Sequence, residues 1–220
     1  MARPTAADRG LLALGTAGAL LWLAHTRGAT RAERRCALPG DDLLGDAQVV
    51  ITRATTVGAP AERIWPWLAQ VGWHRGGWYT APWVDRLLFP ANRPSATEIL
   101  PQHQDIAVGD FVPDGPPETE CGFVVAEVRQ GRHLVLRSTT HLPLTWRRTG
   151  IAAVDWTWSF VLRPTGAGQT RFVFRWRLRG EPWWLVAGCR AFVVPADVLM
   201  SRSMLRGIRV RAETWLPWNG

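Results

Sequence analysis

The sequence contains no lysine, and all 26 of its basic residues are arginine. The formal net charge is +8, a balance that suits nucleic acid or another anionic partner. However, the arginines are spread along the chain, and no nucleic-acid-reading motif accompanies them. The excess therefore indicates a bias of the coding genome, and we expect no nucleic-acid partner.

Cysteine is scarce, and the signatures of several catalytic classes are missing. Three cysteines occur far apart without CxxC spacing, which argues against a disulfide framework and a zinc site. The histidines show no HxxxH or HExxH pairing, and neither a GxSxG serine motif nor a phosphate-binding glycine loop is present. We therefore expect no metal and no cofactor.

Charge is also absent from the N-terminal segment, where residues 11–24 (LLALGTAGALLWLA) are all apolar or small. As a helix, the uncharged stretch 10–26 is about 25 Å long, slightly short of the roughly 30 Å hydrocarbon core of a bilayer. The main interpretation is a membrane anchor. A cleaved signal stays open although no A-x-A site follows Leu23, and so does a packed helix although the run has no polar face.

The arginines that flank this run predict its orientation. Four follow it and two precede it, and basic residues favour the cytoplasmic side of a membrane: Arg27, Arg31, Arg34 and Arg35 against Arg3 and Arg9. We therefore expect a single-pass protein of the cell membrane whose main domain is cytoplasmic.

The chain divides into a hydrophobic segment (1–27), a charged linker rich in Gly and Pro (28–46) and one domain (47–220). The domain begins with a β-branched strand at 47–57. Two helices follow, at 61–71 and 79–88, the first starting near Pro60 and distorted at Pro66. Hairpin-spaced turns then separate five strands at 109–115, 121–131, 133–140, 155–169 and 170–180.

Alternation in the last two strands predicts an antiparallel sheet that is covered on one face. One apolar side comprises Trp156, Trp158, Phe160, Leu162, Phe172, Phe174, Trp176 and Leu178. The other side carries Arg171, Arg175 and Arg177, which we interpret as a solvated face. The covering element is an amphipathic C-terminal helix that presents Val198, Leu205, Ile208, Ala212 and Trp215 at helical spacing, after a kink at Pro195.

This order of elements resembles the START/SRPBCC superfamily, which includes pollen allergens, lipid-transfer domains and polyketide cyclases. Three stretches carry the resemblance: TTVGAPAERIWPWLAQVG (55–72), GGWYTAPWVD (76–85) and MSRSMLRGIRVRAE (200–213). It covers about residues 47–215 and implies an α+β helix-grip fold, a curved antiparallel sheet around a long C-terminal helix. The superfamily has no universal catalytic signature, so the resemblance implies no catalytic residue.

The resemblance also implies a cavity between the sheet and the long helix, closed at one end by the two short helices. The stretch WHRGGWY (73–79) would lie at its entrance, where the glycines let backbone approach a ligand. The expected ligand-binding residues are Trp67, Trp78, Tyr79, Trp83, Trp156, Trp158, Phe174, Trp176 and Leu205. For the tryptophans of 64–86, the alternative is that they only fill the core.

Binding of an apolar small molecule or lipid, without catalysis, is the main interpretation of function. The first alternative is a cyclase or dehydratase that acts on an aromatic or polyketide-like substrate, with His103 and Asp105 as an acid–base pair. The simpler interpretation of His103 and Asp105 is a loop cap. The second alternative is an interaction module whose helix arginines, Arg202, Arg206 and Arg209, contact an acidic partner. Convergent polar side chains inside the cavity would favour an enzyme.

Overall fold

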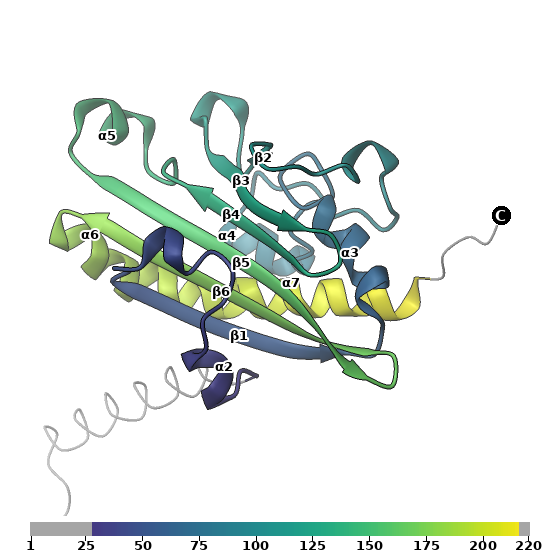
Figure 1. The fold of residues 1–220 in the computed structure, drawn as a ribbon. Helices are drawn as coiled ribbons and strands as arrows, with labels where there is room; N and C mark the ends of the chain where they lie inside the picture. Colours follow the sequence, from purple (N-terminus) through teal and green to yellow (C-terminus); the bar gives the residue numbers. More distant parts are fainter. Residues whose placement is uncertain (1–27, 216–220) are drawn as a thin grey trace, which may run out of the picture.

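A six-stranded antiparallel sheet forms the frame of the molecule (Figure 1). The computed structural model describes residues 28–215, so the predicted membrane anchor lies outside the described residues. The strands lie in the order β1-β6-β5-β4-β3-β2. They are β1 (Val49–Val57), β2 (Phe111–Pro113), β3 (Gly122–Arg129), β4 (His133–Ser138), β5 (Ala153–Gly166) and β6 (Gln169–Glu181). Each strand that the turn spacing predicts is present.

The predicted apolar face of β5 and β6 is the inner face of this sheet. Trp158 pairs with Trp176, and Phe160 pairs with Phe174, so the aromatic side chains of both strands point the same way. All four are buried. The alternation therefore predicted the buried face correctly.

A long C-terminal helix covers the inner face, as predicted. It runs from α6 (Trp183–Gly188) through one π-helical turn (Cys189–Val193) into α7 (Val194–Thr214). The π-helical turn ends just before Pro195, where the sequence predicts a kink, and Pro195 cannot donate the backbone hydrogen bond that a regular helix requires. By length and composition, the stretch Trp183–Thr214 could cross a membrane. In the structure α7 buries Met204, Ile208 and Ala212, as a core helix does.

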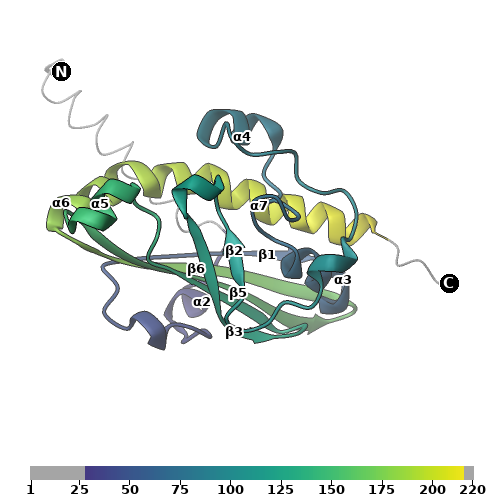
Figure 2. The ribbon, with the colours of Figure 1, turned by 90° about the horizontal axis from the view of Figure 1, so that it is seen from above.

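Two short helices follow β1, α3 (Ala61–Ala69) and α4 (Pro82–Leu88), and both contact α7 (Figure 2). The loop before α4 packs tightly on α7 at Gly207, where any side chain would overlap the backbone of Tyr79. A further helix, α5 (Leu144–Thr149), which the sequence did not predict, connects β4 to β5. A sheet gripping one long helix, with a helix pair after the first strand, is an α+β helix-grip fold.

Residues 28–46, which the composition predicts as a linker, instead pack against the outer face of the sheet. We call them the N-terminal strap; they include helix α2 (Arg31–Arg35) and bury Leu38 and Leu44. The arginines of β6 hold the strap, so the prediction of a solvated outer face is wrong. Arg175 is 3% exposed and pairs with Asp41, because the strap supplies carboxylates and carbonyl groups to the guanidinium groups.

Candidate functional site

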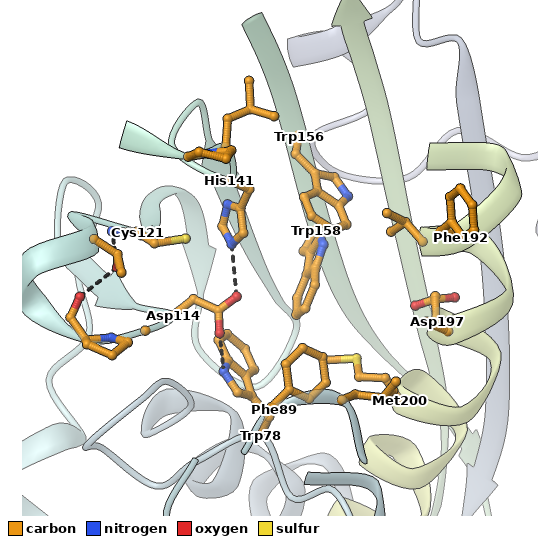
Figure 3. Close-up of a pocket in the computed structure, with 18 of the residues that line it drawn as sticks. Trp78, Phe89, Asp114, Cys121, His141, Trp156, Trp158, Phe192, Asp197 and Met200 are labelled. Carbon is orange, nitrogen blue, oxygen red and sulfur yellow. Dashed lines mark hydrogen bonds and ion pairs between the residues drawn. The ribbon is translucent and has the colours of Figure 1, made fainter. Parts of the chain in front are cut away.

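A cavity of about 770 Å³ lies between the inner face of the sheet, the end of α4 and the first half of α7 (Figure 3). Its wall is mainly apolar. The lining residues are Trp78, Leu88, Phe89, Asp114, Gly115, Pro116, Glu118, Thr119, Cys121, His141, Leu142, Pro143, Leu144, Trp156, Trp158, Phe192, Val193, Ala196, Asp197 and Met200. Ligand pockets in proteins typically measure about 300–1,000 Å³, so this cavity is large enough for a small molecule.

Three of the predicted ligand-binding residues meet in this cavity. Trp156 and Trp158 come from β5, and Trp78 comes from the loop before α4; all three lie in the wall. The rings of Trp78 and Trp158 approach edge to face, with centroids 5.2 Å apart. Edge-to-face contact holds both rings in place, so the aromatic wall is formed before any ligand enters.

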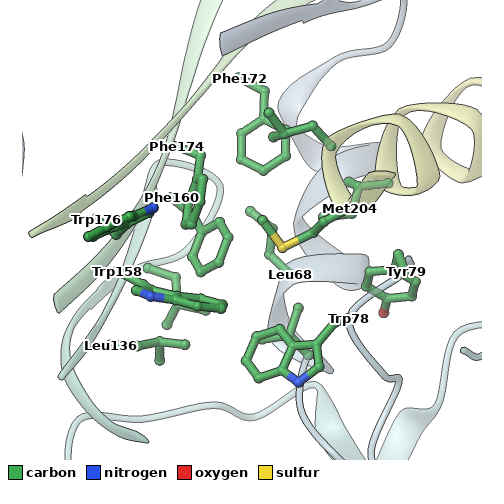
Figure 4. Packing of buried hydrophobic residues seen from close by; sticks show 14 of the residues in the cluster. Leu68, Trp78, Tyr79, Leu136, Trp158, Phe160, Phe172, Phe174, Trp176 and Met204 are labelled. Atoms are coloured by element: carbon green, nitrogen blue, oxygen red, sulfur yellow. The ribbon is translucent and has the colours of Figure 1, made fainter. Parts of the chain in front are cut away.

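The other predicted residues lie elsewhere. Four are almost fully buried in the core outside the cavity wall: Trp67, Tyr79, Phe174 and Trp176. Figure 4 shows the last three of them in the core. Leu205 borders a separate hollow beside Gly28, and Trp83 lies on the solvent side of α4 with 53% of its surface exposed. Neither His103 nor Asp105 lines the cavity: Asp105 borders another hollow below α3.

The glycines of the stretch 73–79 serve the protein itself. The Gly76 amide donates to the carbonyl of Gln70, and a side chain at Gly76 would overlap the Tyr79 hydroxyl. Gly77 has a φ of +78°, which favours glycine. Neither glycine lines the cavity; both belong to a tight loop that follows α3.

The polar part of the cavity wall is a hydrogen-bonded group that the sequence did not predict. His141 Nε2 lies 2.9 Å from Asp114 Oδ2, and Trp78 Nε1 donates to Asp114 Oδ1 at 2.7 Å. Asp114 follows β2, and His141 lies three residues beyond β4. Both β2 and β4 pair with β3, so the sheet brings the two residues together at one end of three strands. No spacing rule along the chain could have signalled this.

The contacts of His141 fit a ring that carries a proton on both nitrogens. Ser138 Oγ lies 2.7 Å from His141 Nδ1 and 3.0 Å from Thr140 Oγ1, and Thr140 Oγ1 itself donates to the Gly122 carbonyl at 2.8 Å. With the Ser138 hydroxyl donating to Thr140 Oγ1, Nδ1 donates to Ser138 and Nε2 donates to the Asp114 carboxylate. In this arrangement His141 is an imidazolium.

The pKa of His141 agrees with this assignment. Burial acts to lower the pKa of the imidazole, but the hydrogen bond to Asp114 and the neighbouring Cys121 side chain outweigh burial and raise the pKa to about 9. The ring also packs on Phe123, with centroids 4.4 Å apart, and its side chain is only 11% exposed. A buried imidazolium requires a nearby anion, and the Asp114 carboxylate is that anion.

The other charged groups of the wall are compensated or lie in contact with solvent. Asp197 of α7 accepts from Arg53 Nη2 at 2.8 Å, and both side chains are buried. Glu118 is exposed to solvent. Among residues 28–215, no group of three or more His, Cys, Asp or Glu side chains is placed to hold a metal ion.

Comparisons with known proteins concern the fold. No family model matches the chain, and no curated protein matches its sequence. A hypothetical protein of Helicobacter pylori is similar in structure, with a TM-score of 0.49, 11% identity and coverage of 84% of this chain and 99% of that one. A conserved protein of unknown function from Enterococcus faecalis has a TM-score of 0.42 and 14% identity, covering 92% and 88%. Truncated norcoclaurine synthase from Thalictrum flavum has a TM-score of 0.40 and 15% identity, covering 72% and 91%.

At such identities a structural likeness concerns the arrangement of elements and not the chemistry of the site. The strand order, the helix pair after β1 and the long helix on the inner face are on their own sufficient to define the architecture. The chain therefore has a helix-grip fold, the fold of the START/SRPBCC superfamily that its sequence resembles.

Proposed function

We propose that the chain binds an apolar small molecule or lipid in the cavity between the sheet and α7. The observation that carries this proposal is the aromatic wall of a cavity of about 770 Å³, with one polar group set into it. Each ring that a ligand covers well contributes about 1–3 kcal/mol to binding. Contact with Trp78, Trp156 and Trp158 would therefore contribute about 3–9 kcal/mol, which corresponds to dissociation constants from the millimolar to the micromolar range.

Exposed apolar side chains at the mouth support a ligand that arrives from an apolar phase. Phe89, at the end of α4, is 38% exposed, and Phe192, in the π-helical turn, is 78% exposed. Both line the cavity from opposite sides in Figure 3. Solvent-exposed rings around an apolar opening mark binding sites for apolar ligands or surfaces. They also agree with the expected anchor at residues 11–24, through which we propose that the domain is tethered to the cytoplasmic side of the membrane.

A cavity-filling variant tests the binding function. Ala196 of α7 lines the cavity, so Ala196→Trp should occupy it and weaken binding of an apolar fluorescent probe at least about tenfold. Ala187 of α6 is exposed, and Ala187→Trp is the matched control that should bind as the parent does. Equal binding by parent and Ala196→Trp would show that the probe does not occupy this cavity. Native mass spectrometry of protein from its own host would then identify the natural ligand.

An enzyme of the cyclase or dehydratase kind is the second candidate, favoured by the convergence of Asp114, His141 and Cys121 on the cavity. Against it, both imidazole nitrogens already donate within the protein, so His141 offers no lone pair to act as a base. Turnover would appear as a change in mass of an aromatic polyketide-like probe during incubation. The interaction module has less support, because docking through Arg202, Arg206 and Arg209 needs no cavity.

A further inference from the structure

The polar group in the cavity wall is electrically neutral as a unit. The imidazolium of His141 and the carboxylate of Asp114 face each other at 2.9 Å, so their charges cancel. Asp197, on the opposite wall, is paired with Arg53. Apart from Glu118, which lies in contact with solvent, the charged side chains of the cavity wall are therefore paired within the protein. A charged ligand would leave water without gaining a counter-ion, and burial of an unpaired charge is strongly unfavourable.

Within this unit, every side-chain N–H group already donates a hydrogen bond to another protein group. His141 donates through both nitrogens, and the indole N–H of Trp78 donates to Asp114. None of the three side chains has a donor left for a ligand. The site is thus poorly suited to a ligand that offers only a carbonyl or carboxylate oxygen.

The remaining capacity of this unit for hydrogen bonds with a ligand lies on the Asp114 carboxylate, as an acceptor. A carboxylate can accept about four hydrogen bonds, and Asp114 accepts one from each neighbour, so lone pairs remain. Its side chain is 22% exposed, and in Figure 3 the carboxylate lies beside Trp158 in the cavity wall, between His141 and Trp78. A hydroxyl group is the neutral donor that fits such an acceptor, because an O–H bonded to a carboxylate is a strong, charge-assisted hydrogen bond.

From these observations we propose that the cavity selects an uncharged alcohol or phenol, whose hydroxyl donates to Asp114 while its hydrocarbon part lies against the tryptophan wall. This inference rests on the proposed binding function. It adds the head group of the ligand, and it assigns specificity to Asp114 and His141, two residues that a general apolar pocket would not need.

Four pyrene probes that share one ring system test the head group: pyrene, 1-pyrenemethanol, 1-pyrenemethylammonium and 1-pyrenecarboxylate. Each is titrated against the full chain at pH 7, and the signal of Ala196→Trp is subtracted as the background of non-specific partition. One hydrogen bond to a charged group should make 1-pyrenemethanol bind about tenfold more tightly than pyrene. Both charged probes should bind at least about tenfold more weakly than 1-pyrenemethanol.

Two variants identify the residues responsible. Asp114→Asn should reduce the advantage of the alcohol over pyrene to less than about threefold, because the acceptor loses its charge. His141→Gln removes the cation but keeps the carboxylate, so binding of the ammonium probe should rise about tenfold over the parent. This gain cannot come from a loss of folding. The double variant His103→Gln/Asp105→Asn lies outside the cavity and is the matched control. It should bind each of the four probes as the parent protein does.

The outcomes separate the two proposals. Parent protein that binds all four probes equally, or binds 1-pyrenecarboxylate best, overturns the inference and leaves the binding function intact. Parent protein that binds none of them above the Ala196→Trp background overturns both. An unchanged response to the ammonium probe in a folded His141→Gln variant would also contradict the neutral ion pair.

Discussion

Trp78 and Trp83 show how far the position of a single side chain can be predicted from the sequence alone. They lie five positions apart in one aromatic stretch, and both were expected at the cavity entrance. Trp78 is buried and hydrogen-bonded to Asp114, whereas Trp83 is on the exposed side of α4. The difference is set by Val84 and Asp85, which are the buried residues of α4 and fix its rotation against the protein. The composition identifies this stretch as unusually aromatic, but only the packing of α4 determines which of the two tryptophans is buried and which is exposed.

His141 gives a residue-scale prediction about pH. Its pKa in the folded protein is about 9, above the ordinary value of 6.5, so folding binds a proton that the unfolded chain releases. The stabilisation is fully present below about pH 6.5 and is lost as pH rises toward 9. The free energy of unfolding should therefore fall by about 2–3 kcal/mol across this interval. Denaturant midpoints measured between pH 6 and 9.5 check the prediction.

His141→Gln is the control for this titration. The pKa values of His103 and His133 are lowered, chiefly by burial, so neither should titrate between pH 6.5 and 9. The variant should start less stable and show a nearly flat profile across the interval. A parent profile as flat as that of the variant would mean that His141 is neutral in the folded protein.

At the scale of elements, the apolar faces were predictable and the polar contacts were not. Alternation in β5 and β6 fixed the inner face, because each strand there shows one apolar and one polar side. The outer face has the same polar pattern whether water or the strap covers it. The strap is charged and rich in Gly and Pro. Arginine side chains of the sheet hold it in place, and the strap groups that they contact follow no regular spacing in the sequence. For this reason the sequence predicted a linker.

Arg175 provides the prediction for the strap. Its guanidinium donates to Asp41, to the carbonyl groups of Cys36 and Glu33 at 2.9 and 2.7 Å, and to Thr52 Oγ1 at 3.0 Å. Arg175→Ala would leave these acceptors, buried or partly buried, without their donor, so we expect a loss of about 3–5 kcal/mol in the free energy of unfolding. Arg202→Ala, on the exposed face of α7, should cost less than about 0.5 kcal/mol. Similar denaturation midpoints for both variants would show that the strap contributes little.

For the whole molecule, the architecture was predicted from the order of elements together with the resemblance to the START/SRPBCC superfamily, and the structure has that order. The existence of a cavity came from the resemblance to a helix-grip family. Its polar wall could not be predicted, since Asp114 and His141 are 27 positions apart and meet only through the pairing of β2, β3 and β4.

The strap also changes how the proposed membrane anchor would hold the domain. Gly28, where the described chain begins, packs against Ala54 of β1, so only residues 25–27 separate the apolar run from the folded part. A deletion that tests the anchor must therefore keep residues 28–46, or it also removes the partners of Arg175. We expect the full chain to sediment with membranes and to resist alkaline washing, and a chain that starts at Gly28 to stay in the supernatant, because the uncharged run supplies most of the membrane affinity.

Two further measurements separate the alternatives for this segment. A C-terminal tag should be protected from protease added outside intact cells, since the arginine excess after the run predicts a cytoplasmic domain. The intact mass of the mature protein should include residues 1–27. A shorter mass would indicate a cleaved signal, and a soluble full chain would indicate a helix packed on the domain. An accessible tag on a membrane-bound chain would reverse the orientation and place the cavity on the outer side.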